Sequence, residues 1–228
     1  MRKITDHVYQ ITLGAVNAFV IEDDGLTLVD TGYKGSADKI FNAIKKGGKD
    51  PKDIRRIILT HLHLDHAGSA AEIKRRLNVP VMAHEEDAKE IEKGIAGRKS
   101  RVVSPGGFNW LMFQLLIKGT PVVIEPTQVD RRLQDGDELP FAGGIQVIHT
   151  PGHTAGHIAL WVRADNLVIA GDICANIFGL ALSVVYEDTD IGLQSLRKVA
   201  ALDFDKAVFG HGGPIHRGAN LKLRKKFG

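Results

Sequence analysis

The sequence predicts an α/β sandwich. Short strands rich in β-branched residues and segments with helical spacing both run along the 228 residues, but they do not alternate strictly as strand, helix and strand. That order argues against a doubly wound parallel sheet. The composition, 43% apolar and 25% charged, is typical of a globular protein with a sizeable core, and no linker or low-complexity tract divides the chain. We therefore expect one domain over residues 1–228.

The first half of the chain is expected to open with three strands and to continue with strands and helices in turn. Gly14 and the Asp24-Gly25 pair separate the opening strands. Ser36 suits the N-cap of the first helix, and Gly47 suits its end. The expected strands are 7–12, 17–22, 26–30, 54–59 and 79–83, and the expected helices are 36–46, 69–77 and 85–93.

The second half begins with a segment that lacks regular spacing. Residues 94–120 contain an apolar run at 108–117, and we expect a helical insertion there, on the substrate side of the molecule. The expected strands that follow are 122–124, 138–140, 145–149, 158–162, 167–170 and 206–209, with a helix at 191–202. The basic residues after position 220 are expected to form a solvated end.

Charge and apolar runs exclude several classes of protein. The chain has 30 basic and 27 acidic residues, and four of the basic ones follow residue 220, so the rest of the chain carries a net charge of −1. A nucleic-acid partner is not expected, because phosphate binding needs a clustered basic surface. No apolar stretch is long enough to span a bilayer, and the N-terminus lacks the apolar core of a secretory signal. With Cys174 as the one cysteine, we expect a cytoplasmic protein without a membrane partner.

Histidines are concentrated between residues 60 and 68. His61, His63, Asp65 and His66 lie within six residues of a chain that has ten histidines in all. Imidazoles and a carboxylate this close together are unfavourable unless a cation accepts their lone pairs. Extended backbone would place His61 and His63 on one side, where they can bind one ion. Asp65 and His66 lie beyond a turn, where they can bind a second.

Further ligands are expected from loops elsewhere in the chain, because a metal site takes at least three protein ligands. His153, Asp172 and His211 each lie in a loop that follows an apolar strand, and such strand ends converge on one rim of a sheet. The expected arrangement is one nitrogen-rich site, a neighbouring site and a bridging acid: His61, His63 and His153; Asp65, His66 and His211; and Asp172.

In combination these motifs resemble the metallo-β-lactamase superfamily. The chain has HxHxDH at 61–66, GHT at 152–154, GD at 171–172 and GHG at 210–212, and VDTG at 29–32 is similar to the family's first acidic motif. The resemblance covers about residues 17–214. It implies an αββα sandwich of two mixed sheets with a metal site at their edge, and it gives the seven residues above the same ligand roles.

The resemblance also bears on three other polar residues. Asp30 becomes a supporting acid, although a solvated aspartate at a strand end explains it almost as well. His157 resembles the second histidine of the family's GHTxGH motif and is expected to have a structural role. His84 could line the pocket, but a surface loop is expected.

The resemblance implies a dinuclear hydrolase. Two divalent ions and two carboxylates leave a net positive charge that can hold a bridging hydroxide at neutral pH. Asp65 is the candidate to orient this hydroxide and to pass a proton to the leaving group. We expect cleavage of an ester, thioester or lactone bond in a small acyl substrate. Zinc is the expected metal, and His, Asp and water also suit iron, manganese or cobalt.

Departures from particular family members narrow the choice. Zinc β-lactamases of the resembling kind use a cysteine in the second site or lack the bridging acid, so β-lactamase activity is not expected. Glyoxalase II enzymes have an additional C-terminal helical region, whereas 17 residues follow His211 here. Members that process tRNA carry an RNA-clamping arm, which the near-neutral chain argues against. Lactonases often place a tyrosine shortly after the bridging acid; residues 173–176 contain none, and Tyr33 or Tyr186 could replace it.

Two other functions fit part of the pattern. Persulfide dioxygenases of the same superfamily use one iron held by two His and one Asp, but they do not need the second group of ligands. A metal-stabilised binding module would be expected to lose ligands. The apolar run leaves three possibilities open: it caps a lipophilic substrate, packs against a second copy of the chain as a homodimer, or is buried in the core. Its side chains are Phe108, Trp110, Leu111, Phe113, Leu115 and Leu116.

Overall fold

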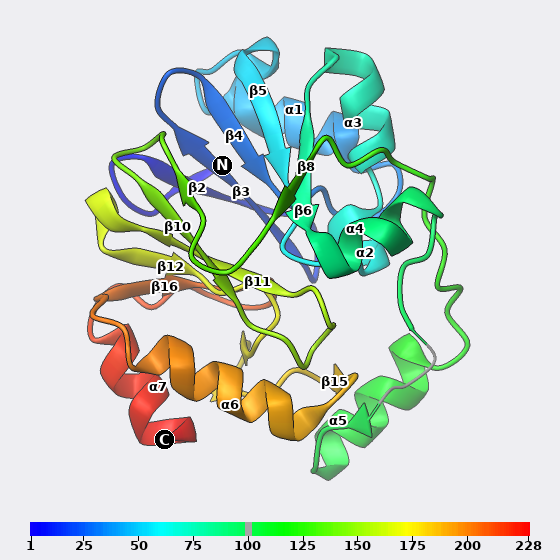
Figure 1. Ribbon diagram of the computed structural model, residues 1–228, viewed down its shortest axis with the longest axis vertical. Coiled ribbons are helices and arrows are strands. Elements are labelled where there is room, and N and C mark those ends of the chain that lie inside the picture. The colour runs from blue at the N-terminus through cyan, green and yellow to red at the C-terminus, as the bar shows by residue number, and fades with distance from the viewer. Residues whose placement is uncertain (99–101) are drawn as a thin grey trace.

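Two sheets pack face to face between layers of helices in the computed structural model, which describes residues 1–98 and 102–228 (Figure 1). The first sheet has the order β1-β2-β3-β4-β5-β6-β8, and the second has the order β16-β12-β11-β10-β9. This arrangement confirms the predicted αββα sandwich of mixed sheets. The strands of the first sheet are β1 (Arg2–Lys3), β2 (Val8–Thr12), β3 (Asn17–Glu22), β4 (Leu26–Val29), β5 (Ile54–Ile58), β6 (Val81–His84) and β8 (Arg131–Leu133). Those of the second are β9 (Glu138–Leu139), β10 (Ile145–His149), β11 (Ile158–Val162), β12 (Leu167–Ile169) and β16 (Lys206–Val208).

Helices cover the outer face of each sheet. In Figure 1, α1 and α3 lie against the first sheet, and α6 and α7 lie below the second. The helices are α1 (Ala37–Lys46), α2 (Leu64–Ala67), α3 (Ala70–Leu77), α4 (Glu85–Glu92), α5 (Gly107–Met112), α6 (Thr189–Ala200) and α7 (Ala219–Phe227), with a π-helical turn at Phe113–Ile117 and 3₁₀ turns at Pro51–Asp53 and Arg163–Asp165. Two short strand pairs complete the fold: β7 (Val102–Val103) with β15 (Val185–Tyr186), and β13 (Ala175–Asn176) with β14 (Leu180–Ala181).

Strand alternation divides the apolar side chains among three cores. On β3, Ala18 and Val20 pack beneath the helices of the first layer, whereas Phe19 and Ile21 face the second sheet. Successive side chains of a strand point to opposite faces, so a strand with both faces covered is apolar throughout. Residues 17–21 of β3 are accordingly all buried. Because both sheets are covered on both faces, a polar site can form only at their edges.

Most expected elements occur within two residues of their predicted bounds, and the clearest differences concern β8 and the strand expected at 122–124. The strand expected at 122–124 does not form, and Val123 makes one isolated bridge to Ile95. The sequence did not predict β8, because Arg131 and Arg132 are exposed at the sheet edge and only Leu133 is buried. An edge strand buries few side chains, so its sequence carries little apolar signal.

The C-terminal residues form a helix instead of the expected solvated end. α7 buries Leu223 and Phe227 in the core beneath the second sheet, while Lys222, Lys225 and Lys226 are exposed. A spacing of four residues places the two apolar side chains on one face of the helix. The sequence suggested a solvated end because charged residues outnumber apolar ones after position 220. Two large buried side chains are nevertheless enough to anchor a helix of this length.

We expect Leu223→Ala to lower the free energy of unfolding by about 2–3 kcal/mol, because it leaves a cavity in the core beneath the second sheet. Leu221 on the same helix is 63% exposed and serves as the matched control. Leu221→Ala should change the free energy of unfolding by no more than about 0.5 kcal/mol. Urea unfolding of both variants measures the difference, and equal losses would contradict the core position of Leu223.

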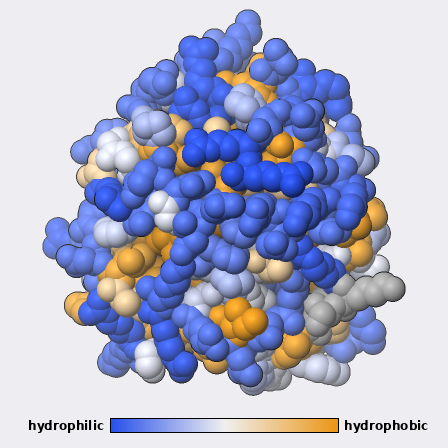
Figure 2. Space-filling model, in the orientation of Figure 1, coloured by the Kyte–Doolittle hydropathy of each residue, from blue (hydrophilic) through white to orange (hydrophobic). Residues whose placement is uncertain are grey.

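The expected insertion at 94–120 contains α5, and its residues 99–101 lie outside the described residues. Phe108, Trp110, Leu111 and Leu115 are between 47% and 68% exposed. Figure 2 shows a largely hydrophilic face with several separate apolar areas. Burial in the core is therefore wrong for these four side chains. The side chain of Leu116 lies outside the described part of the structure.

Within residues 1–98 and 102–228, no helix combines the length and the apolar character needed to cross a bilayer.

Candidate metal centre

Five strands end at the same edge of the sandwich, and the segments after them carry the predicted site residues. β4 and β5 run parallel in the first sheet, and β10, β12 and β16 share one direction in the second. Carboxyl ends of such strands meet at one edge, so residues far apart in sequence come together. The site residues follow these strands in the order Asp30 after β4, His61 and His63 after β5, Asp65 and His66 on α2, His153 after β10, Asp172 after β12 and His211 after β16.

His61, His63 and His153 form the first group, and their candidate ligand atoms lie within 4.8 Å of one another. The Nε2 atom of His153 is 2.9 Å from Nδ1 of His63. The rings of His61 and His153 meet edge-on, with centroids 4.8 Å apart. Three imidazoles facing one point is the nitrogen-rich arrangement that a borderline-soft divalent ion prefers.

Asp65, His66 and His211 form the second group, again with candidate ligand atoms within 4.8 Å. Oδ2 of Asp65 lies 3.3 Å from Nε2 of His211 and 3.7 Å from Nε2 of His66. Asp172 lies between the two groups: its Oδ2 is 3.0 Å from Nε2 of His211 and 3.7 Å from Nε2 of His153. The fold thus brings together all seven residues that the sequence singled out.

In four of the site histidines, the ring nitrogen that faces away from the site, Nδ1, donates a hydrogen bond that holds the ring. His61 donates to the hydroxyl of Thr60, and His66 donates to the carboxylate of Asp30. His153 and His211 donate to the backbone carbonyl oxygens of residues 185 and 15. With Nδ1 donating outward in each ring, the Nε2 atom faces the site, which is the arrangement that orients metal-binding histidines.

Asp30 is the acid that supports this arrangement, and its solvated alternative is wrong. Its side chain is completely buried, with Oδ1 accepting from the backbone N–H of Thr60 at 2.8 Å. Oδ2 accepts from the Thr60 hydroxyl at 2.8 Å and from Nδ1 of His66 at 2.9 Å. Asp30 adopts a left-handed backbone conformation, with φ at 61°, which turns its side chain beneath the loop that carries His61. Aspartate tolerates this conformation better than most residues.

Protons are unevenly distributed over the site histidines. Burial lowers the pKa of His61 well below its usual range and the pKa of His63 to about 3. Burial would also lower the pKa of His66, but Asp172, Asp65 and Asp30 raise it well above its usual range. Asp172 and Asp65 likewise raise the pKa of His211 against the effect of burial.

The two carboxylates of the site show the matching shifts. Burial would raise the pKa of Asp65, but His66 and His211 lower it to about 2. His211 and His66 lower the pKa of Asp172 well below its usual range in the same way. The second group therefore holds two protons that a divalent cation would displace, whereas the first group is already neutral.

Three buried atoms of the site lack a hydrogen-bond partner among the described residues, which is the main test of whether a metal fits. They are Nε2 of His61, Nε2 of His66 and Oδ1 of Asp172. Buried polar atoms without a hydrogen bond are costly, and these three converge on one place, where Nε2 of His66 and Oδ1 of Asp172 face each other as an ion pair at 3.5 Å. Gly210 packs so closely against them that a Cβ there would lie 2.0 Å from Oδ1 of Asp172. The donor set and its close backbone packing fit divalent cations.

Two further histidines near the site have other roles. Nδ1 of His157 bonds the Thr150 hydroxyl at 2.7 Å, and its Nε2 accepts from the backbone N–H of Asp172 at 2.9 Å. Both ring nitrogens are thus engaged, which confirms a structural role for His157. His84 is buried, and its ring stacks on that of His149 with centroids 3.9 Å apart. The expectation of a surface loop is wrong for His84, because it ends β6 beneath the start of α4.

Of Tyr33 and Tyr186, only Tyr33 is exposed. Burial and the nearby Asp65 carboxylate raise the pKa of its phenol, and 43% of the residue is accessible to solvent. Tyr186 is buried, with its hydroxyl donating to the carbonyl oxygen of Ile173 at 2.5 Å and accepting from the backbone N–H of Ser183. Cys174 is also buried in the core, as expected of a small apolar residue.

Sequence reasoning missed Asp87, a buried carboxylate of α4 that bonds the loops of both His61 and His153. An acid in the first turn of a predicted helix suits the helix dipole, and Glu85 and Glu86 share that property. Nothing in the spacing therefore distinguishes Asp87 from its neighbours.

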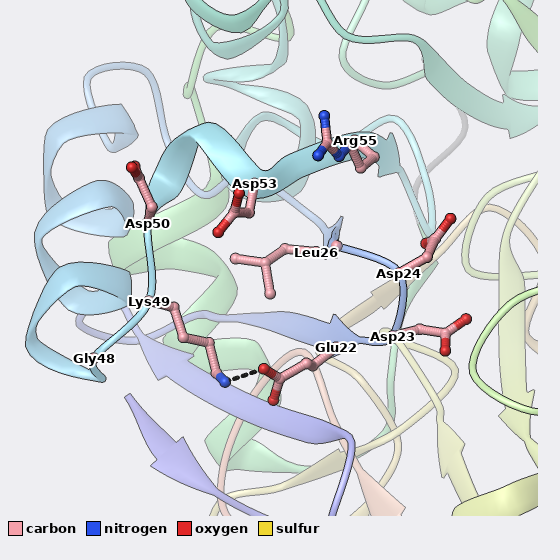
Figure 3. Close-up of a pocket in the computed structure, with 10 residues that line it drawn as sticks. Glu22, Asp23, Asp24, Leu26, Gly48, Lys49, Asp50, Asp53 and Arg55 are labelled. Atoms are coloured by element: carbon pink, nitrogen blue, oxygen red, sulfur yellow. Dashed lines mark hydrogen bonds and ion pairs between the residues drawn. The ribbon is translucent and has the colours of Figure 1, made fainter.

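A polar hollow lies at the opposite end of the first sheet from the metal centre (Figure 3). It encloses about 420 Å³ near the amino end of β4, whereas Asp30 follows the carboxyl end of the same strand. Its lining is mainly acidic, and Lys49 forms an ion pair there with Glu22. None of the seven site residues lines this hollow.

A sandwich of this kind with a buried His and Asp site at its edge defines a metal-dependent hydrolase. The chain belongs to the metallo-beta-lactamase superfamily, whose family model matches residues 11–211. The match includes all seven site residues and Asp30.

Relatives and solved structures agree with this assignment. A probable metallo-hydrolase of Bacillus subtilis (strain 168), YflN, is 27% identical over 91% of this chain and 84% of its own length. A hydroxyacylglutathione hydrolase of Rhizobium meliloti (strain 1021) is 29% identical over 75% of this chain, which spans only 52% of that protein. The crystal structure of a metallo-beta-lactamase family protein from Thermus thermophilus has a TM-score of 0.72 and 23% identity, covering 98% of this chain and 79% of that one. At that identity the structural likeness shows the fold alone.

Proposed function

We propose that this protein hydrolyses an ester, thioester or lactone bond in a small acyl substrate, using two divalent ions, with zinc as the favoured metal. His61, His63 and His153 would hold the first ion, Asp65, His66 and His211 the second, and Asp172 would bridge them. The observation that carries this proposal is the convergence on one place of buried Nε2 and carboxylate atoms, three of which have no hydrogen-bond partner among the described residues. Bound ions of this kind supply a nucleophilic hydroxide at neutral pH and polarise a carbonyl.

The protein's own groups would then position the reacting atoms and move the proton. Asp65 is only partly buried, and its pKa of about 2 keeps the carboxylate ionised at neutral pH. An ionised carboxylate facing the solvent side of the site can accept the proton of the attacking water and deliver it to the leaving group. Tyr33, the exposed phenol beside it, is suited to donate a hydrogen bond to substrate. Cys174 and Tyr186 are buried and take no part as nucleophiles.

The apolar side chains of α5 would contact the apolar part of the substrate. The segment before α5 is tied to the site: the Ser104 hydroxyl donates to the carbonyl oxygen of residue 183, and β7 pairs with β15. The carbonyl oxygen of Val185 in β15 holds His153. Phe108 of α5 also contacts Phe178 edge-on, at the turn that follows β13. A second copy of the chain on the same patch is the alternative, and both would leave these side chains exposed in the single chain.

Metal content and turnover together test the proposal. Elemental analysis of protein purified without added metal is paired with a panel of lactones, thioesters, cephalosporins and glutathione persulfide. Two ions per chain and acyl hydrolysis are expected, with rates that rise as the acyl chain lengthens. One iron per chain with oxygen consumption on the persulfide would overturn the hydrolase in favour of a dioxygenase. Size-exclusion chromatography with light scattering distinguishes a dimer from a monomer.

A further inference from the structure

Asp87 lies in the first turn of α4 with its carboxylate completely buried between two loops of the metal centre. One loop carries His61 and His63 and follows β5 of the first sheet. The other carries His153 and follows β10 of the second sheet. The two loops therefore belong to different sheets, and their separation must be set by contacts between them.

A single oxygen of Asp87 joins these loops. Its Oδ2 accepts from the backbone N–H of Leu62 at 3.1 Å and from the hydroxyl of Thr154 at 2.7 Å. Leu62 lies between the two histidines of the first loop, and Thr154 directly follows His153. The other oxygen, Oδ1, accepts from the backbone N–H of Gly156 at 2.9 Å. Burial raises the pKa of Asp87, but the hydrogen bonds from Thr154 and Gly156 and the charge of Arg98 favour the ionised carboxylate, whose hydrogen bonds are about twice as strong as neutral ones.

Arg98 and Gly156 hold the carboxylate itself in place. Nη1 of Arg98 donates to Oδ1 of Asp87 at 3.1 Å and also contacts Glu187 at 3.2 Å. Glu187 accepts in turn from the backbone N–H of Ala155, in the loop of His153. A Cβ at Gly156 would lie 2.6 Å from Cγ of Asp87, so no larger residue fits there. The carboxylate is thus compensated by a cation and confined on the side of the second loop.

We propose that Asp87 is a positioning residue that sets the distance between His153 and the pair His61 and His63. This inference rests on the proposed function only in that the three histidines bind an ion. Asp87 touches none of the candidate ligand atoms itself. It acts through the backbone of Leu62 and the side chain of Thr154, whereas Asp30 holds His66 directly and His61 through Thr60.

Zinc affinity without substrate tests the inference. In the wild type each of the two carboxylate oxygens of Asp87 accepts two hydrogen bonds. The side chain of Asp87→Asn has one oxygen and one NH2 group, so this NH2 group must face hydrogen-bond donors on one side. The affinity of the first group should fall about tenfold, the lower end of the effect seen for groups that orient metal ligands. Competition with a chromophoric zinc chelator measures it, in a His211→Ala background that removes a ligand of the second group. Cobalt absorption in the same protein gives an independent spectroscopic signal.

A control and a second pair of variants separate positioning from folding. Asp165→Asn removes another buried carboxylate, which accepts from Thr5 and His7 at the N-terminus, and zinc affinity should not change. Thr154→Val should weaken zinc binding in the same direction as Asp87→Asn, and Thr154→Ser should restore it. These two variants decide the matter if Asp87→Asn does not fold.

The outcomes distinguish this inference from the proposed function. Two zinc ions in the wild type, with unchanged affinity in Asp87→Asn and Thr154→Val, would overturn the inference and leave the hydrolase intact. Weaker zinc binding in both variants, with no acyl hydrolysis by the wild type, would support the inference and overturn the hydrolase. A wild type that binds no zinc would overturn both.

Discussion

The Asp65→Asn enzyme is expected to hydrolyse its acyl substrate about 10²–10⁴-fold more slowly than the wild type, the usual contribution of a positioned acid or base. Asparagine keeps the shape and an oxygen of the side chain but cannot accept a proton. The carboxylate of Asp65 is ionised and lies 3.3 Å from Nε2 of His211, at the open side of the site. The loss should therefore appear in kcat, measured with saturating substrate and added zinc.

Metal content and a matched variant control this experiment. Asp65 is also a candidate ligand, so the zinc content of the variant is measured alongside its rate. Asp203→Asn makes the same charge change at an exposed aspartate and should keep the wild-type rate. A fully loaded Asp65→Asn protein with wild-type kcat would contradict the role of Asp65 in proton transfer.

The Asp30→Asn protein is expected to unfold more easily by about 3–5 kcal/mol in the absence of metal, because it removes one partner of a buried ion pair with His66. Zinc affinity should also fall by up to about 100-fold, since Asp30 orients His66 directly and His61 through Thr60. Asparagine suits the left-handed backbone at position 30, so the substitution adds little strain of its own.

Urea unfolding with a chelator present measures the first effect, and chelator competition measures the second. Asp165→Asn again provides the comparison, because Asp165 is a buried aspartate remote from the metal centre. A loss of stability with unchanged zinc affinity would show that Asp30 supports the fold but does not orient the metal ligands.

The fold and most of the site could be predicted because their signals are local. A strand with both faces covered has a continuous apolar run in its sequence, as β3 and β12 do. Helix α1 could be predicted because a glycine follows its last turn. Four candidate ligands can be found without knowledge of any long-range contact, because they lie within six residues: His61, His63, Asp65 and His66. His153, Asp172 and His211 were recognised because each follows an apolar strand.

Elements with few buried side chains were harder to predict. β8 buries Leu133 alone, and α7 buries two large apolar side chains, Leu223 and Phe227, among its charged ones. Their position is decided by the surface they meet: the free edge of the first sheet for β8, and the apolar underside of the second sheet for α7. That surface does not exist until the rest of the chain has folded.

The sequence by itself determined the class of fold, the seven candidate ligands and the acid that could carry a proton. The tertiary structure decided which polar groups support them. It placed Asp30 beneath His66, and it engaged Tyr186 and His157 in hydrogen bonds with the backbone. It also brought Asp87 between two loops from different sheets. The reason is physical: a ligand motif is encoded by neighbours along the chain, whereas a supporting hydrogen bond joins residues that become neighbours only when the two sheets pack.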